Sequence, residues 1–377
     1  MDQNKPKMLF IAERFPPSLG GQQNYNFHLY REFKAHLPAF LIAPGIYLPF
    51  NLHKLWYFPY AVAAGIRIGR KHRITHVHIS SARLAPVGLL IAGFLKVTLS
   101  ASVHGLDVTL SGKSFFYKWL TPRCLARFNH IFCNSPATLA RCIQIGLRPG
   151  LCHMVPCGVD GAVHRRTLTR KAARMKLHRM LGIDFEKKVI LLTVGRLVKR
   201  KGVAWFAETL MPRLPEDHVY IVLGASGPEL RPVRRLIETP PLAQRVFIFP
   251  DAPDTLRSLV YDAADLFVMP NIRVAGQQEG FGLVLLEAGM HNIPVVASAI
   301  EGIPAAVRDG ITGLLVKTET PEAFIRAIGA VQKWDTGEDK IRRAVSAVYG
   351  WDKAYRAIAS ILGFPPPDHG EKGGTNE

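Results

Sequence analysis

A glycine-bearing turn between two glutamates is the part of the sequence best suited to chemistry. It reads Glu279-Gly280-Phe281-Gly282-Leu283 and continues as an apolar run to Glu287. The glycines predict a turn that leads into a helix, and the free backbone N–H groups at a helix start attract phosphate. Carboxylates accept hydrogen bonds from sugar and ribose hydroxyls. If both glutamates are helical, their spacing puts them about 80° apart at about 3.6 residues per turn. The pair can then contact two ends of one elongated ligand; as an isolated feature it is equally a solvated helix face.

Cations follow a buried strand earlier in the same half of the chain. The apolar run Val189–Val194 predicts the strand, and Gly195, Arg196, Lys201 and Gly202 come after it. Ligands bind outside the carboxyl ends of the strands in open α/β sheets, and a guanidinium and an ammonium at that place suit a diphosphate. Taken alone, the same residues are a basic surface turn.

Two segments of the first half also place glycine after a strand. His104-Gly105 follows the apolar run Thr98–Val103. A histidine beside a glycine can approach a ligand closely, although a lone histidine is more often structural. Gly20-Gly21 follows a shorter apolar run, and a Gly-Gly turn by itself is common in proteins.

These segments need strands and helices to position them, and short apolar runs alternate with helical patterns along the whole chain. A first set of strands is predicted at Lys7–Ala12, Phe40–Ala43, His76–Ile79, Thr98–Val103, Ile131–Asn134 and Cys152–Val155. A second set is predicted at Val189–Val194, Tyr220–Leu223, Val246–Phe249, Leu266–Met269, Pro294–Ala297 and Gly313–Val316. The alternation predicts α/β domains, in which helices cover both faces of parallel sheets. Two such sheets would leave a cleft between their carboxyl ends.

The length of 377 residues predicts two domains. A basic, weakly apolar run at residues 164–182 marks their junction, so we expect domains over residues 1–165 and 166–350. Residues 351–364 are predicted to form a final helix. Residues 365–377 are predicted to form a disordered tail, because they cannot bury apolar surface.

The positive charge is concentrated in the first half. The formal net charge is +19, and residues 1–170, with 21 Lys and Arg against five Asp and Glu, hold +16 of it. This asymmetry predicts that the N-terminal domain faces nucleic acid, an anionic membrane surface or a phosphorylated acceptor. Aromatic residues and cations mix without acids in Pro49–Arg73. That composition suits an anionic membrane interface, or else a core helix with a basic outer edge.

The cysteine content and the hydropathy of the sequence indicate the cellular compartment. The five cysteines are odd in number and include no Cys-x-x-Cys pair, which predicts buried thiols in a reducing cytoplasm and no metal site. The apolar runs at Met8–Ala12 and Leu84–Val103 predict neither a signal peptide nor a transmembrane span. We therefore expect a cytoplasmic protein, peripheral on the cytoplasmic face of the membrane if the basic half docks there. No helix-turn-helix, zinc finger or RNP-like motif supports nucleic-acid binding.

Taken together and in order, the motifs resemble those of glycosyltransferase family 4. The resemblance runs through Phe15-Pro16-Pro17, Gly20-Gly21, His104-Gly105, Pro156-Cys157-Gly158-Val159-Asp160, Gly195-Arg196, Lys201-Gly202, Glu279-Gly280-Phe281-Gly282 with Glu287-Ala288, Gly302-Ile303-Pro304 and Asp309–Val316. It departs from the family pattern at Gln22, Gln23, Cys157, Glu301 and Ala305. The resemblance implies the GT-B architecture: two Rossmann-like parallel-sheet domains facing a central cleft, with the final helix crossing back to the N-terminal domain.

The resemblance also implies a role for each donor-side motif. Arg196 and Lys201, with Gly195 at the turn, would bind the donor diphosphate. Glu279 would hydrogen-bond the donor sugar, and Glu287 would accept hydrogen bonds from the ribose hydroxyls. Backbone groups of the turn would contact sugar or phosphate, namely those of Gly280, Phe281, Gly282 and Leu283.

On the N-terminal side, Gly20 and Gly21 would bring backbone up to the nucleotide or acceptor, and His104 would lie over the donor sugar. The implied catalytic residues are therefore His104, Arg196, Lys201 and Glu279, without a metal or other cofactor.

The reaction implied is retaining transfer of a hexose-type sugar from a UDP- or GDP-sugar to a lipid-linked or glycan acceptor, in cell-surface polysaccharide or glycolipid synthesis. Preorganised cations and helix-start amides would stabilise the departing phosphate. A soluble transferase that forms glucans or disaccharides is the first alternative. A non-catalytic sugar-nucleotide binder and a nucleic-acid-binding protein are remote ones. The segment Phe247–Pro253, expected beside the base, contains no readable code for UDP or GDP.

Overall fold

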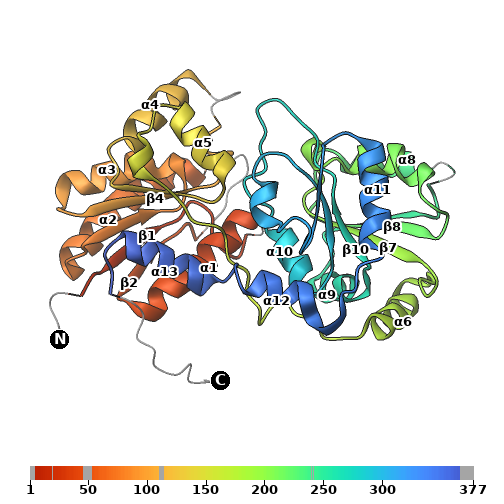
Figure 1. Ribbon diagram of the computed structural model, residues 1–377. Helices are drawn as coiled ribbons and strands as arrows, with labels where there is room; N and C mark the ends of the chain where they lie inside the picture. Colours follow the sequence, from red (N-terminus) through yellow and green to blue (C-terminus); the bar gives the residue numbers. More distant parts are fainter. Residues whose placement is uncertain are drawn as a thin grey trace. The chain divides into compact units, whose positions relative to one another are not determined.

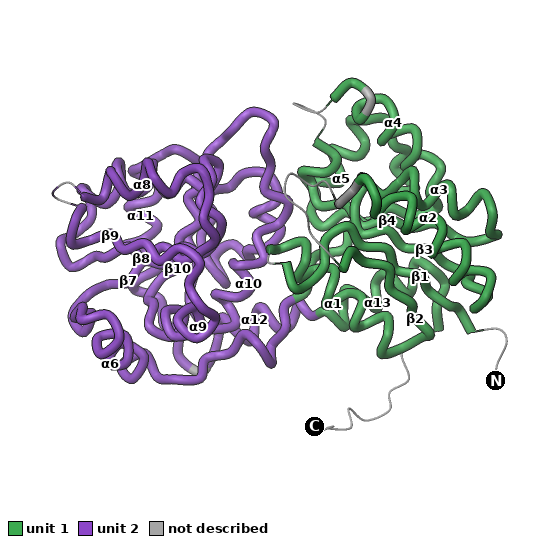
Figure 2. The backbone as a smooth tube through the Cα atoms, turned by 180° about the vertical axis from the view of Figure 1, so that it is seen from behind, with its two compact units in different colours: residues 1–158, 351–377 green, residues 159–350 purple. Residues whose placement is uncertain are grey.

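The structure, a computed structural model, describes residues 5–18, 20–45, 53–109, 114–238, 240 and 242–365, without the side chains of His53, Lys54, Phe116 and Glu338. The chain forms two compact units (Figure 2). Unit 1 comprises residues 1–158 and 351–377, and unit 2 comprises residues 159–350. Residues 49–52 of the basic aromatic segment and 366–377 of the predicted tail lie outside the described residues.

Unit 1 contains a sheet of six parallel strands in the order β2-β1-β3-β4-β5-β6 (Figure 1). They are β1 (Met8–Ile11), β2 (Ala39–Ile42), β3 (His76–Ile79), β4 (Thr98–Val103), β5 (His130–Cys133) and β6 (Cys152–Met154). The chain runs from β1 outward to β2 and then returns past β1 to β3. The loops after β1 and β3 therefore diverge at the carboxyl edge, which is where open α/β sheets bind ligands.

Alternate side chains of the unit 1 strands face different helices. Leu9 and Ile11 belong to a core that also holds residues of α2 (His53–His72), α3 (Ala85–Phe94), α4 (Phe115–Leu125) and α5 (Pro136–Gln144). Phe10, on the other face of β1, contacts Phe33 of α1 (Gly21–His36). The last helix, α13 (Trp351–Ile361), packs beside α1 (Figure 1). Helices therefore cover both faces of the sheet, which explains its nearly continuous apolar strands.

Unit 2 contains a second parallel sheet, in the order β12-β11-β10-β7-β8-β9. Its strands are β7 (Val189–Val194), β8 (His218–Gly224), β9 (Val246–Pro250), β10 (Leu266–Met269), β11 (Val295–Ser298) and β12 (Gly313–Val316). Its helices are α6 (Arg170–Leu181), α7 (Val203–Thr209), α8 (Leu230–Ile237), α9 (Asp254–Ala263), α10 (Leu283–Met290), α11 (Pro321–Val331) and α12 (Lys340–Ser346). The strand order reverses between β7 and β10, so this sheet also has a switch point at its carboxyl edge.

The α/β class with two Rossmann-like parallel sheets is confirmed, and each of the twelve predicted strands is present within two residues of its expected ends. The first boundary between the units falls at residue 158, whereas the sequence placed it at 165. Residues 159–165 belong to unit 2, because the chain that directly follows them is hydrogen-bonded to α9 of that unit. Asp262 of α9 accepts hydrogen bonds from the backbone N–H groups of Thr167 and Leu168 at 3.1 and 3.0 Å.

Candidate active site

In unit 2, the loops after β7 and β10 leave the sheet at its switch point. The loop after β7 contains Gly195, Arg196 and a short 3₁₀ turn at Lys199–Lys201. The loop after β10 contains Asn271 and leads to Glu279. Because β7 and β10 are neighbours in the sheet, side chains 79 residues apart in the sequence come into contact.

Glu279 is the centre of this contact. Its Oε2 accepts hydrogen bonds from Lys201 Nζ at 2.8 Å and from Asn271 Nδ2 at 3.3 Å. The same oxygen pairs with Nη1 of Arg200. The side chains of Glu279 and Lys201 are only 12% and 9% exposed. Two cations and a carboxylate are thus held together where little water reaches them.

The charged groups of this cluster shift one another's pKa values. Burial alone would raise the pKa of Glu279, but the charges of Lys201 and Arg200 outweigh burial and lower this pKa to about 2. Burial lowers the pKa of Lys201; Glu279 opposes that shift, and the positive charges of Arg200 and Arg196 reinforce it. The carboxylate of Glu301 also lies here and accepts a hydrogen bond from the backbone N–H of Glu279. Three positive charges then face two negative ones, and the excess positive charge leaves the group able to accept an anion.

Two glycines allow the loops of this site to approach each other. A Cβ on Gly202 would lie 1.9 Å from the carbonyl oxygen of Pro270, and Gly202 has a left-handed φ of 67°. A Cβ on Gly302 would lie 1.9 Å from the carbonyl oxygen of Gly280. The N–H of Gly302 donates to the carbonyl of Glu279 at 3.0 Å. A side chain at either glycine would therefore push the backbone beneath the cluster out of place.

Helix α10 begins directly after the turn, with Gly282 at its N-cap and no side-chain cap. The N–H groups of its first turn are therefore suited to an anionic ligand. Glu287, further along α10, is buried and accepts a hydrogen bond from the hydroxyl of Tyr261 at 3.0 Å. His164 Nε2 lies 3.9 Å from its other oxygen. Glu287 thus has partners different from those of Glu279.

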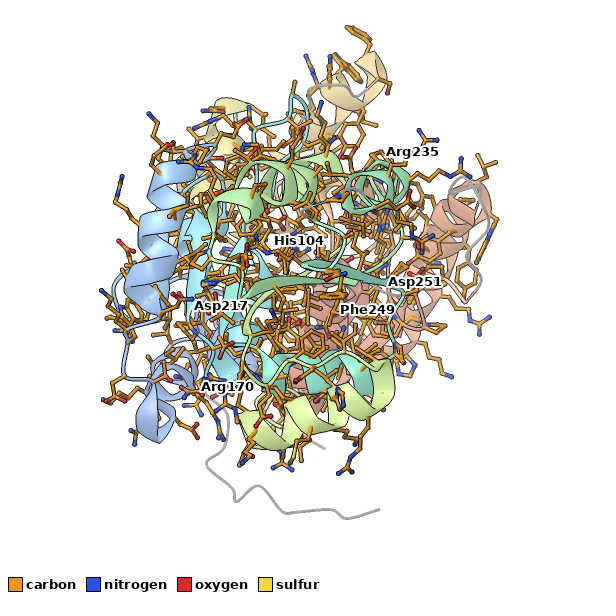
Figure 3. All side chains as sticks on the ribbon, turned by 90° about the vertical axis from the view of Figure 1, so that its right-hand side faces the viewer. His104, Arg170, Asp217, Arg235, Phe249 and Asp251 are labelled. Atoms are coloured by element: carbon orange, nitrogen blue, oxygen red, sulfur yellow. The ribbon has the colours of Figure 1, made fainter. Side chains whose placement is uncertain are left out.

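The loops after β8 and β9 are tied to each other at the same edge. Asp251 follows β9, close to Phe249 (both labelled in Figure 3). Its carboxylate accepts hydrogen bonds from the N–H and the hydroxyl of Ser226, at 3.1 and 2.6 Å. These bonds lower the pKa of Asp251. These bonds connect the segment Phe247–Pro253, expected beside the base, to the loop after β8.

In unit 1, His104 follows β4 at the carboxyl edge of its sheet. Its Nε2 donates to the carbonyl of Ser80 at 3.1 Å, and the same carbonyl accepts from Gln22 Nε2 at 3.3 Å. The backbone N–H of His104 donates to Asp107 at 2.8 Å. Burial lowers the pKa of His104, an effect that Asp107 opposes. A neutral imidazole with its proton on Nε2 presents Nδ1 as a hydrogen-bond acceptor.

The final helix supports this half-site. The ring of His104 lies edge-on to Tyr25 of α1, with centroids 4.6 Å apart, and Tyr25 lies edge-on to Trp351 of α13 at 5.4 Å. Gly20, at the N-cap of α1, has a φ of 147°, and Gly21 is the first residue of that helix. The end of α1 that bears both glycines is therefore fixed partly by the C-terminal helix.

Within each unit, the structure brings some of the predicted residues together. Lys201 and Glu279 are in contact, Arg196 is exposed nearby, and Glu287 lies in the same helix that follows the turn. Sequence reasoning assigned no role to Arg200 or Asn271. The only sequence signal for Arg200 is its place beside Lys201, and Asn271 had no signal beyond its position after a strand.

The chain matches two family models. Residues 19–162 match the model for Glycosyltransferase Family 4, and residues 188–333 match the model for Glycosyl transferases group 1. Together these models match most of the chain, and its fold is that of the GT-B glycosyltransferases. The chain belongs to the family 4 (group 1) glycosyltransferases.

The curated relatives that match include D-inositol 3-phosphate glycosyltransferases. The one from Mycolicibacterium gilvum is 35% identical over 59% of this chain and 48% of its own length. The one from Corynebacterium urealyticum is 34% identical over 58% of this chain and 52% of its own length. The chain therefore spans about half the length of these relatives.

Solved structures match over almost the whole chain. Anabaena HepE in complex with UDP has a TM-score of 0.75 at 20% identity, covering 95% of this chain and 99% of its own. Sucrose-phosphate synthase from Thermosynechococcus elongatus has the same TM-score at 19% identity, and the match covers 95% of this chain and 98% of its own. At these identities the likeness shows the fold.

Proposed function

We propose that the protein transfers a hexose-type sugar, with retention of anomeric configuration, from a nucleoside-diphosphate sugar to a lipid-linked or glycan acceptor. The observation that carries the proposal is the buried cluster of Glu279, Lys201 and Arg200 at the switch point of unit 2. It combines cations for a diphosphate with a carboxylate for sugar hydroxyls. Structures of HepE with UDP and with UDP-glucose support a nucleotide-sugar donor.

In the proposed reaction the bond between the anomeric carbon and the β-phosphate oxygen breaks as the acceptor oxygen bonds to that carbon. The acceptor's proton passes to the departing diphosphate, so that no separate base is required. Lys201 and Arg196 stabilise the charge that develops on the leaving group, together with the first-turn N–H groups of α10. Loss of one preorganised donor of this kind typically costs about 2.7–4 kcal/mol of transition-state stabilisation.

The other residues bind and orient the substrates. Glu279 receives sugar hydroxyls on its carboxylate, and Glu287, held by Tyr261, receives ribose hydroxyls. Neutral His104 accepts a hydrogen bond from the donor sugar through Nδ1. Gly20 and Gly21 bring the start of α1 close to the nucleotide or acceptor. None of these roles requires a metal.

A thermal-shift screen with UDP, GDP and ADP, followed by their sugars, tests the donor assignment. A ligand that binds only the folded protein raises the melting temperature. We expect one diphosphate to do so in the wild type and to lose most of its effect in Lys201→Met. No shift with any nucleotide, together with no turnover of any nucleotide sugar, would overturn the proposal.

We further propose that unit 1 docks on an anionic membrane surface. Seven large apolar side chains, 37% to 84% exposed, project from three neighbouring helices; they are Leu55, Trp56, Tyr60, Leu90, Phe94, Phe115 and Trp119. The same helices and the residues just after them present exposed cations, namely Arg67, Arg70, Lys71, Lys96, Lys118, Arg123 and Arg127. The sequence has no acid from residue 53 to 106. Exposed aromatics among cations suit an anionic lipid interface.

In the part of the chain that the structure describes, none of the helices is both long enough and apolar enough to cross a bilayer. We propose a peripheral association, on the cytoplasmic face of the membrane. Co-sedimentation with phosphatidylcholine vesicles, with and without phosphatidylglycerol, tests it. We expect salt-sensitive binding to the anionic vesicles only, weakened in Phe115→Ser/Trp119→Ser. The matched control Met180→Ser changes an exposed apolar residue of unit 2 and should bind like the wild type. Equal binding to both vesicle types at low salt would contradict docking by charge.

A small phosphorylated acceptor is the second candidate, because the relatives reported above are named for D-inositol 3-phosphate. The basic unit 1 suits a phosphate as well as it suits a lipid surface. An assay without lipid, with inositol phosphate as acceptor, distinguishes the two: product formed at full rate would support the soluble acceptor and remove the need for a membrane.

A further inference from the structure

Three of the five cysteines converge beside the edge strand of the unit 1 sheet. Cys133 is the last residue of β5, Cys142 lies in α5, and Cys152 is the first residue of β6. Their three Sγ atoms all lie within 4.8 Å of one another, and those of Cys133 and Cys142 are 3.7 Å apart. All three side chains are buried.

The topology explains how residues at positions 133, 142 and 152 meet. Strands β5 and β6 are parallel, with Ile131 opposite Cys152 and Cys133 opposite Met154. Paired residues of neighbouring strands point to the same face of a sheet, and so do residues two apart. Cys133 and Cys152 therefore share a face, and Cys142 of α5 is part of the same buried cluster on that face.

The spacing of the sulfur atoms matches that of a metal-binding site. Thiolates about 2.3 Å from a metal ion lie about 3.8–4.0 Å from one another in tetrahedral or trigonal geometry. The observed 3.7 Å between Cys133 and Cys142 is close to this range, and small rotations of Cys152 would bring its sulfur into it. Among the described strands, β6 is the last of this sheet, so Cys152 lies at the edge of the sheet.

The number of ligands favours one kind of ion. Among the described residues, the group contains three sulfur atoms and no histidine or carboxylate. Soft thiolates select Cu(I), Zn²⁺ and iron–sulfur clusters. Structural Zn²⁺ and the clusters take four ligands from the protein, so a group of three sulfur atoms favours Cu(I). We propose that Cys133, Cys142 and Cys152 form a three-sulfur binding site for Cu(I), which would tie α5 to the edge of the sheet.

This site is separate from the residues assigned to sugar transfer and does not depend on that proposal. It lies near them, because Cys133 is paired with Val103 in the sheet and His104 comes next in the chain. Binding should therefore be measured directly and not through activity.

The test is titration of the reduced, metal-free full chain with Cu(I) under anaerobic conditions, with a chromophoric chelator as competitor. We expect one tightly bound ion per chain by elemental analysis. At a free ion concentration of 100 Kd the protein gains about 2.7 kcal/mol of stability, a rise of about 5–10 °C in melting temperature for a unit of this size. In Cys142→Ala, the Kd for Cu(I) should be at least 100-fold higher than in the wild type.

The matched control is Cys124→Ala, which removes another buried cysteine outside the cluster and should keep one ion per chain. A circular dichroism spectrum like that of the wild type shows that Cys142→Ala is folded; if it is not, Cys152→Ala replaces it. Three results would overturn the proposal: less than one-tenth of an ion per chain, equal affinity in the cluster variants, or preference for Zn²⁺ over Cu(I).

Discussion

Substitution of Glu279 by glutamine should separate the stabilising role of this carboxylate from its role in binding. The folded protein lowers the pKa of Glu279 from 4.5 to about 2, because the charges of Lys201 and Arg200 outweigh burial. A lowered carboxyl pKa stabilises the fold above the unfolded value, and this contribution is lost as pH falls through the folded value. At 1.36 kcal/mol for each pKa unit, the wild type gains about 3 kcal/mol at pH 7 and about 2 kcal/mol at pH 3.5.

The assay is urea unfolding of the wild type and Glu279→Gln at pH 7, 5 and 3.5. We expect the variant to be less stable by about 3 kcal/mol at pH 7, with the gap narrowing by about 1 kcal/mol at pH 3.5. Glu322→Gln is the matched control. It also removes a carboxylate paired with an arginine, but that pair is exposed and water screens it. The control should unfold like the wild type at every pH.

Binding provides an independent readout for the same variant. Removing the carboxylate leaves Lys201 and Arg200 free to meet a diphosphate, so the Kd for the nucleoside diphosphate should stay equal or fall. Turnover should fall about 10-fold to 150-fold, because a hydrogen bond to a charged group contributes about 1.5–3 kcal/mol. Equal stability of wild type and variant at pH 7, or a gap that does not change with pH, would refute the electrostatic reasoning.

Three further predictions concern neighbouring parts of unit 2. Lys201→Met should lower kcat/KM about 10²-fold to 10³-fold in steady-state kinetics; near-normal turnover would remove it from the mechanism. Tyr261→Phe leaves the buried carboxylate of Glu287 without its donor, at a cost of about 1–3 kcal/mol. It should raise the donor KM with little effect on kcat, and a change in kcat alone would contradict that role. Gly302→Ala should lose about 1–3 kcal/mol of unfolding free energy, because its Cβ would lie 1.9 Å from a backbone carbonyl oxygen. Gly329→Ala, which meets no atom within 4 Å, should lose none.

The fold could be predicted from the sequence because its strands are short apolar runs with turn residues at their ends. Val189–Val194 is recognisable as a buried parallel strand without any tertiary information, and the glycines after it mark where the chain turns. The boundary between the units was harder to predict from the sequence. The residues before α6 contain no apolar periodicity, and their attachment to unit 2 depends on Asp262, a residue distant in the sequence.

The candidate site was predictable to the extent that its residues stand in local motifs. Glu279, Lys201 and His104 each follow a strand and have a glycine nearby. Each segment was ambiguous by itself, and the resemblance of all of them together to glycosyltransferase family 4 selected these residues. Arg200 was not selected, because sequence cannot show that both adjacent cations, and not Lys201 alone, turn toward the distant carboxylate of Glu279. Asn271 was missed for a similar reason, since its contact with Glu279 depends on the path of the loop between them.

By itself, the sequence determined the α/β class, the position of the strands, the concentration of positive charge in the first half and the motifs of the site. These features depend on local periodicity and composition, which the order of residues encodes directly. The tertiary structure decided that Lys201 and Arg200 both pair with Glu279, and how three cysteines without a recognisable spacing come together. Such contacts depend on strand order, because parallel strands that are neighbours in a sheet can be far apart in the chain.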